Sequence, residues 1–266
     1  MRKIYRYLIS EINKNNIEDR FLFTNNQLIE ENKNYKENFI FKNLKKKETF
    51  YKIYKFLKNN LDINKKTLFI GSSWGWCEFF LMKDFDIIAS DVEEHYVNYH
   101  KSNTSLNYIK LDILNLDIKN KYDQIVINNI EFLFDEEQLS KSIKNISNIS
   151  NPGSKVFVIF RSRDGFIPKL IDNYLLPFET YLVYLLKKLK KKVYLTKNHL
   201  GFRRNISKFI ELYKQNNFTL ISIYKDMFSY DFQRLRTVQK FRLSYLLSII
   251  TFKSNPYLNI IVFKKK

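Results

Sequence analysis

The chain has 266 residues, of which 45% are hydrophobic and 17% aromatic, and its formal net charge is +19 at pH 7. This apolar content excludes wholesale disorder and is enough for one large α/β domain with added helices. The chain has only 5 glycines and 4 prolines, which argues against collagen-like, linker-rich and all-β repeat designs.

The N-terminal region, residues 1–63, is expected to form a helical cap. Two sets of apolar residues in it have the spacing of one helix face. The sets are Tyr5, Leu8, Ile9 and Ile12, and then Phe50, Ile53, Tyr54, Phe56 and Leu57. No Pro/Gly linker separates this region from residues 64–266, so we expect the cap to belong to the domain that follows.

Five continuous apolar runs predict strands of a parallel sheet. They cover residues 67–70, 87–90, 108–111, 124–127 and 155–160. Runs without alternation are typical of strands that are covered on both faces. Helical patterns lie between most of them, at 77–82, 94–101 and 136–149, and this order predicts right-handed crossovers.

The remainder of the chain predicts two further strands and two helical insertions. The strands are expected at 219–224 and 258–263, and the insertions at about 165–210 and 231–252. The fold class is therefore α/β, with helices on both faces of a Rossmann-like sheet.

Polar residues stand where the first four strands end. They are the segment 71–75, Asp91, Asp112 and the pair Asn128-Asn129. In an open α/β sheet the carboxyl ends of the strands form the ligand-binding edge. Asp91 follows Gly71 by 91 − 71 = 20 residues, a distance at which an acid reaches ribose hydroxyls. Asp112 could accept a hydrogen bond from an adenine amino group.

The segment 71–75 indicates which nucleotide-like ligand fits. A dinucleotide fingerprint needs three glycines, but Ser73 and Trp76 occupy the second and third positions. No Gly-Lys-Ser/Thr follows, so a P-loop is also excluded. The pattern favours a ligand with a ribose and a base but no phosphate at the helix start, and S-adenosylmethionine is such a ligand.

These segments resemble the class I S-adenosylmethionine-dependent methyltransferase family. The matching segments are TLFIGSSWG (67–75), SDV (90–92), LDI (111–113), YDQIVINN (122–129) and NPGSKV (151–156). The resemblance implies seven strands, the last inserted antiparallel. It also implies S-adenosylmethionine as the cofactor, bound by Gly71, Ser72, Ser73, Trp74, Gly75, Asp91, Val92, Asp112, Ile113, Asn128 and Asn129. Phe69 and Ser73 stand where the family usually has an acid and a glycine.

Simpler structural roles remain open for several of these residues. Asp91 could cap the helix that begins near Glu93, and Asp112 could be a turn residue. Trp74 could pack under the sheet edge. Cys77 is expected to be a small core residue rather than a nucleophile.

The acceptor side of the reaction has fewer candidates. His199 and Glu131 are the candidate general bases for an oxygen or nitrogen acceptor. Their alternative roles are a surface histidine and an acid at a helix start. Arg161 and Arg163 follow the fifth strand and could hold an anionic acceptor, or could lie in a solvated loop.

The basic charge and the single cysteine limit partners and compartment. The charge fits either a functional basic surface or a coding bias toward lysine. Residues 178–193 form a basic amphipathic pattern that could contact an anionic membrane or simply pack on the core. One cysteine excludes an intramolecular disulfide and a cysteine-based zinc cluster, so we expect no metal and a cytoplasmic location.

Three functions remain in competition. The leading prediction is methyl transfer to a small-molecule acceptor such as a sugar, a lipid-linked compound or an amine metabolite. Methyl transfer to RNA or protein is the alternative that the basic charge suggests, and salt-sensitive RNA binding would favour it. A non-catalytic binding module is the third, suggested by Phe69 and Ser73.

Overall fold

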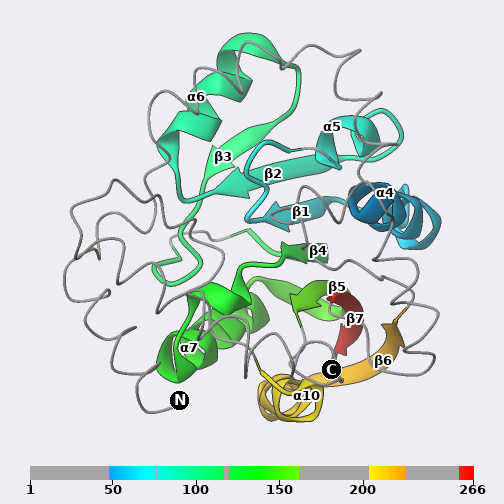
Figure 1. Cartoon of the computed structure of the whole chain (residues 1–266), viewed down its shortest axis with the longest axis vertical. Helices are drawn as coiled ribbons and strands as arrows, with labels where there is room; N and C mark the ends of the chain where they lie inside the picture. The colour runs from blue at the N-terminus through cyan, green and yellow to red at the C-terminus, as the bar shows by residue number, and fades with distance from the viewer. Residues whose placement is uncertain (1–47, 76, 117–119, 162–203, 226–257) are drawn as a thin grey trace, which may run out of the picture.

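The computed structural model describes residues 48–75, 77–116, 120–161, 204–225 and 258–266 (Figure 1). Most of the expected cap, most of the insertion at 165–210, all of the insertion at 231–252 and the basic segment 178–193 lie outside these residues. Trp76, Arg163 and His199 lie outside them as well.

Seven strands form one sheet in the order β3-β2-β1-β4-β5-β7-β6 (Figure 1). The strands are β1 Thr67–Ile70, β2 Ile87–Asp91, β3 Tyr108–Lys110, β4 Tyr122–Asn128, β5 Ser150–Arg161, β6 Phe218–Tyr224 and β7 Leu258–Lys265. Strands β1 to β5 pair in parallel, whereas β7 pairs antiparallel with both β5 and β6. The predicted Rossmann-like sheet with an inserted antiparallel last strand is confirmed.

Helices cover both faces of the sheet. They are α4 Glu48–Asn60, α5 Glu78–Leu81, α6 Glu94–Asn103, the 3₁₀ helix η2 Glu131–Leu133, α7 Glu136–Asn148 and α10 Ile206–Gln215. One apolar cluster joins α7 and α10 to the sheet, and a second joins α4, α5 and α6 to its other face. Successive side chains of β1 point to opposite faces of the sheet. Leu68 and Ile70 therefore belong to the first cluster, whereas Phe69 belongs to the second.

The strand β5 begins earlier than the sequence predicts. Its pairing with β4 shifts register, because Tyr122 pairs with Ser150 whereas Gln124 pairs with Lys155. The predicted turn at 151–153 therefore lies inside the irregular start of β5, where Gly153 has a φ of +79°. The turn residues produce a bulge in the strand rather than a loop before it.

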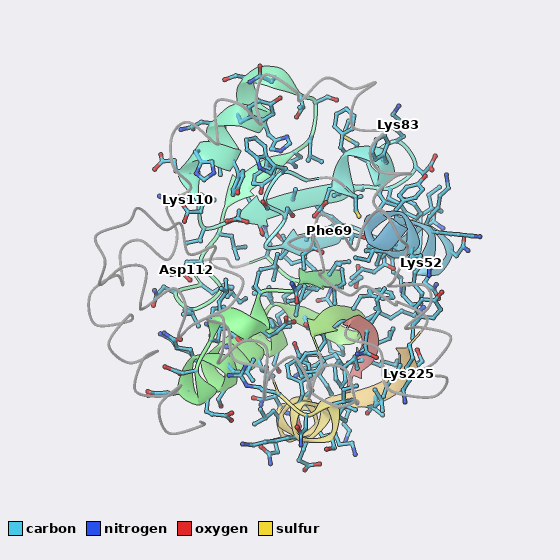
Figure 2. The ribbon with its side chains drawn as sticks, in the orientation of Figure 1. Lys52, Phe69, Lys83, Lys110, Asp112 and Lys225 are labelled. Carbon is cyan, nitrogen blue, oxygen red and sulfur yellow. The ribbon has the colours of Figure 1, made fainter. Side chains whose placement is uncertain are left out.

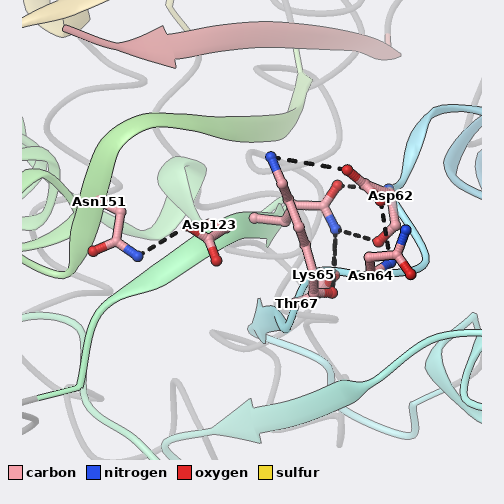
Figure 3. Close-up of polar contacts among 7 residues, drawn as sticks. Asp62, Asn64, Lys65, Thr67, Asp123 and Asn151 are labelled. Atoms are coloured by element: carbon pink, nitrogen blue, oxygen red, sulfur yellow. Dashed lines mark hydrogen bonds and ion pairs between the residues drawn. The ribbon is translucent and has the colours of Figure 1, made fainter.

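A buried glutamine, Gln124, holds the connection from α4 to β1 against the sheet. Figure 3 labels its partners Asp62 and Thr67. Gln124 of β4 accepts a hydrogen bond from the Asp62 backbone N–H (2.8 Å) and donates to the Asp62 carbonyl (3.0 Å) and the Thr67 hydroxyl (3.0 Å). These bonds satisfy a side-chain amide that is removed from water. They fix α4 on the sheet from the amino ends of the strands, opposite the expected ligand edge.

Within the described ranges, no helix has the length and apolar character needed to cross a membrane.

Candidate functional site

The strand register brings the polar strand ends to one edge. Ile70 of β1 pairs with Ser90 of β2 and with Ile127 of β4. The next residue along each strand, Gly71, Asp91 or Asn128, therefore lies at the same level of the sheet. This is the carboxyl edge, where open α/β sheets bind ligands.

The loop 71–75 has a backbone that repeatedly enters the left-handed region. Gly71, Ser73 and Gly75 have φ values of 77°, 51° and 60°. A Cβ on Gly71 would lie 2.2 Å from Cγ2 of Ile130, so this position has no room for a side chain. Left-handed backbone at a non-glycine residue costs free energy and is concentrated at functional sites. Ser73 therefore adopts the conformation for which the family pattern uses glycine.

Asp91 joins this loop to the following helix. One carboxylate oxygen accepts a hydrogen bond from the Ser73 N–H (2.9 Å), and the other accepts from the Glu93 N–H (3.1 Å). Burial raises the pKa of Asp91, although these backbone bonds oppose the shift. A carboxylate has about four acceptor positions, so capacity remains for ribose hydroxyls. Both roles considered for Asp91, helix start and ligand acid, are compatible with this geometry.

Asp112 lies beyond the end of β3, at the same edge of the sheet (Figure 2). Its carboxylate organises a turn. Its two oxygens accept from the Leu114 N–H (2.9 Å) and the Asn115 side-chain amide (2.8 Å). Ile113 is buried beside it, whereas Val92, after Asp91, is 45% exposed. An exposed apolar residue next to Asp91 is suited to contact the face of an adenine ring. The turn role of Asp112 is present, and its predicted contact with adenine stays a prediction.

Trp74 packs beneath the loop. Its side chain is only 6% exposed, and its ring meets the edges of Tyr96 (5.0 Å between centroids) and Tyr99 (5.3 Å) on α6. The side chain of Trp74 is therefore not available to a ligand at the loop. The bulky residue is accommodated because α6 presents an aromatic surface to it.

Two further aromatic residues support the loop, and the sequence reading missed both. The Tyr108 hydroxyl donates to the Ser73 carbonyl (2.8 Å), and His100 stacks on the Tyr108 ring at 4.6 Å. Burial lowers the pKa of His100 to about 4, so its ring is neutral at physiological pH. Because Tyr108 stands in a strand and His100 in a helix, their common contact with the loop depends on the tertiary fold.

Glu78 is a site residue that sequence reasoning also missed. It begins α5, is fully buried, and accepts a hydrogen bond from the Asn128 side-chain amide (3.1 Å). Burial raises the pKa of Glu78 from 4.5 to about 7. The available signal was an acid in the otherwise apolar segment that runs from Cys77 to Leu81.

Asn129 follows with a left-handed backbone (φ 54°). Its side-chain oxygen is buried and has no hydrogen-bond partner among the described residues. Such an atom at the ligand edge is available to a donor on a bound molecule. This geometry fits the expectation that Asn128 and Asn129 line the site.

Glu131 lies in a more enclosed position than a general base requires. It is 3% exposed, and its backbone carbonyl accepts a hydrogen bond from the Arg204 guanidinium (2.8 Å). Burial raises the pKa of Tyr213 on α10, and the charge of Glu131 adds to this shift. These contacts favour a role in holding η2 and α10 together, and the role of Glu131 as a base stays a prediction.

The remaining candidates are only partly described. Arg161 is the last residue of β5, at the carboxyl edge, and its role in holding the acceptor stays a prediction. Arg163 and His199 lie outside the described residues, so their roles stay predictions. Cys77 is buried, and burial raises its thiol pKa well above the usual value, in agreement with a core residue rather than a nucleophile.

Sequence comparison alone gives no relative: neither the models of known protein families nor the curated protein sequences contain a match to this chain. Solved structures do match. A phosphoethanolamine N-methyltransferase 2 from Haemonchus contortus, in complex with S-adenosylmethionine, aligns with a TM-score of 0.55 at 14% identity over 81% of this chain and 52% of that one.

Two shorter enzymes align over most of their length. A SAM-dependent methyltransferase from Thermotoga maritima gives a TM-score of 0.52 at 14% identity, over 85% of this chain and 98% of its own. A TehB-like SAM-dependent methyltransferase from Corynebacterium glutamicum gives 0.50 at 14% identity, over 80% and 86%. At such low identities the likeness establishes the fold, and the chain therefore has the Rossmann-like fold of the S-adenosylmethionine-dependent methyltransferases.

Proposed function

We propose that this protein is an S-adenosylmethionine-dependent methyltransferase that acts on an oxygen or nitrogen atom of a small molecule. The observation that carries the proposal is the common placement of the loop 71–75, Asp91 and Asp112 at the carboxyl ends of β1, β2 and β3. This edge offers two carboxylates, the buried side-chain oxygen of Asn129 and an exposed Val92. It contains no phosphate-binding motif, so it suits an adenosine joined to an amino acid.

The residues fit the cofactor chemically. Asp91 retains acceptor positions for ribose hydroxyls, and the unpartnered oxygen of Asn129 offers an acceptor to a donor such as an ammonium group. Bound S-adenosylmethionine supplies an electrophilic methyl group. The residues of the chain align the acceptor with that methyl group and exclude water from the site.

The acceptor pocket depends on residues that leave the same edge. We propose that Arg161 and Arg163 hold an anionic part of the acceptor, and that His199 or Glu131 removes its proton where one must leave. A small acceptor agrees with one structural neighbour, the Haemonchus contortus enzyme, which was solved with phosphomonomethylethanolamine and S-adenosylhomocysteine. The contact of residues 178–193 with an anionic membrane stays a secondary proposal.

Isothermal titration calorimetry with S-adenosylmethionine tests the proposal. Asp91→Asn keeps the shape of the side chain but removes its charge, and we expect about 10- to 100-fold weaker binding, since a charged hydrogen bond contributes about 1.5 to 3 kcal/mol. Asp123→Asn is the matched control, because Asp123 lies at the amino end of β4, where it accepts from Asn151 (2.9 Å). Failure of the wild type to bind at about millimolar cofactor, a weak affinity on any scale, would contradict the proposal.

A further inference from the structure

The carboxylate of Glu78 lies buried beneath the ligand edge. Its side chain is 0% exposed, yet it belongs to the short helix that directly follows the loop 71–75. It accepts a hydrogen bond from Asn128, whose backbone ends β4 at the ligand edge. A buried carboxylate is costly unless a cation or a proton compensates its charge.

The charged surroundings of Glu78 oppose its ionisation. Desolvation is the largest effect on its pKa, and Asp91 on β2 adds a like charge. Hydrogen bonds from the backbone of α5 and from Ser72 act in the opposite direction but do not outweigh burial. The titratable neighbours are Cys77 beside it, Asp91, and His95 on α6, which interacts with Asp91.

We propose that Glu78 is a positioning residue of the cofactor site, which orients Asn128 and supplies a buried negative charge that favours the positively charged sulfonium over the demethylated product. This inference rests on the proposed function. It adds a third carboxylate to those of Asp91 and Asp112, at the start of α5, whereas Phe69 of β1 is apolar and buried. The site would thereby prefer the methyl donor and release its product.

We expect the binding of S-adenosylmethionine to release a proton from Glu78. The apo protein holds a proton on Glu78 up to about pH 7, because burial raises its pKa to about 7. A nearby sulfonium stabilises the ionised carboxylate and lowers that pKa, so binding releases the proton. Affinity for S-adenosylmethionine therefore increases as the pH rises through neutrality. S-adenosylhomocysteine, whose sulfur is neutral, should show a smaller increase.

The experiment compares both ligands by calorimetry at about pH 6 and about pH 8, in buffers of different ionisation enthalpy. For the wild type we expect the Kd of S-adenosylmethionine to fall about fivefold over this range, with proton release, if binding lowers the pKa of about 7 by about one unit. Glu78→Gln keeps an acceptor for Asn128 but has no charge. This variant should lose the change in the Kd of S-adenosylmethionine with pH and much of the preference for S-adenosylmethionine. It should still bind S-adenosylhomocysteine.

The controls separate the possible failures. His95, Asp91 and the ligand's own titrating groups are present in both proteins, so a pH effect that arises from them persists in Glu78→Gln. Glu78→Ala additionally removes the acceptor and should weaken both ligands. An unchanged pH dependence and ligand preference in Glu78→Gln would overturn the role of Glu78, whereas absence of wild-type binding would overturn the proposed function itself.

A measurement on the apo wild type covers the case in which the variants do not fold. The side-chain amide signal of Asn128 in an NMR titration should shift with a midpoint near neutral pH, because its acceptor changes charge. A signal that does not change across this range would contradict the inference without use of any variant.

Discussion

Individual residues at the ligand edge show how an unusual loop sequence keeps the required shape. Ser73 takes a left-handed conformation in place of glycine and is held there by Asp91 and Tyr108. Trp74 points into the aromatic surface of α6. Gly71 has no such substitute, because the proximity of Ile130 leaves no room for a side chain and its φ of 77° would add strain.

The two costs at Gly71 can be separated by a matched pair of substitutions. Gly71→Ala combines left-handed strain with a steric clash against Ile130, and we expect a loss of about 2 to 4 kcal/mol in the free energy of unfolding. Gly153→Ala has the same strain (φ +79°) but open space, since the nearest atom, on Lys264, is 4.0 Å from the added Cβ. Its loss should be about 1 to 2 kcal/mol. Urea unfolding measures both, and equal losses would contradict the close approach of Ile130.

Glu78 should make stability depend on pH. Its pKa in the folded protein is about 7, against an ordinary value of 4.5, so between these pH values the folded protein keeps a proton that the unfolded chain releases. The contribution of Glu78 to the free energy of unfolding therefore falls as the pH rises from 4.5 to about 7 and is constant above that pH. The total loss is on the order of 3 kcal/mol.

Glu78→Gln has no proton to lose. We expect it to be more stable than the wild type above about pH 7, and to approach the wild type near pH 4.5, the ordinary pKa of the group. Chemical unfolding of both proteins at the two ends of this range measures the difference. Parallel pH dependences of the two proteins would show that the carboxylate ionises freely in the folded state.

At the scale of elements, helices and strands follow from local sequence, but their docking does not. The apolar spacing in residues 50–57 predicts a helix, which the structure describes as α4. Continuous apolar runs predict five of the seven strands, and all seven expected ranges agree with the structure to within a few residues, except at the start of β5. There the bulge depends on pairing with β4, which local sequence does not contain. The sequence likewise predicts only that Gln124 lies in a strand, because the partners of its side chain are about sixty residues away.

The docking of α4 is expected to depend on Gln124. Gln124→Ala leaves the Asp62 N–H and the Thr67 hydroxyl without their buried partner, and we expect a loss of about 1 to 3 kcal/mol in unfolding free energy. Asn151→Ala, which removes one half-buried bond at the same edge, should cost less. Ligand affinity should stay unchanged in both, because these residues lie at the amino ends of the strands. A large loss of cofactor binding in Gln124→Ala would contradict the separation of the two edges.

At the scale of the whole molecule, the fold and the carboxylates at the strand ends could be predicted. The order of strands and helices along the chain determines the class of sheet and the places of the loops at its edge. The residues that support the site could not be predicted, because they act through contacts between distant segments. They are Glu78, His100, Tyr108 and Arg204. The sheet thus has two functional edges. Its amino edge fixes α4, and its carboxyl edge gathers the loop 71–75, Asp91, Asp112 and Asn128.

The most direct test of this arrangement is an NMR titration of the labelled protein with S-adenosylmethionine. We predict saturable shifts in the backbone amides of Gly71, Ser73, Asp91 and Asn129, at the carboxyl edge. The amides of Asp62 and Asn151, at the amino edge, should stay unchanged. Shifts confined to the amino edge, or no shifts at saturating cofactor, would contradict the assignment of the ligand site.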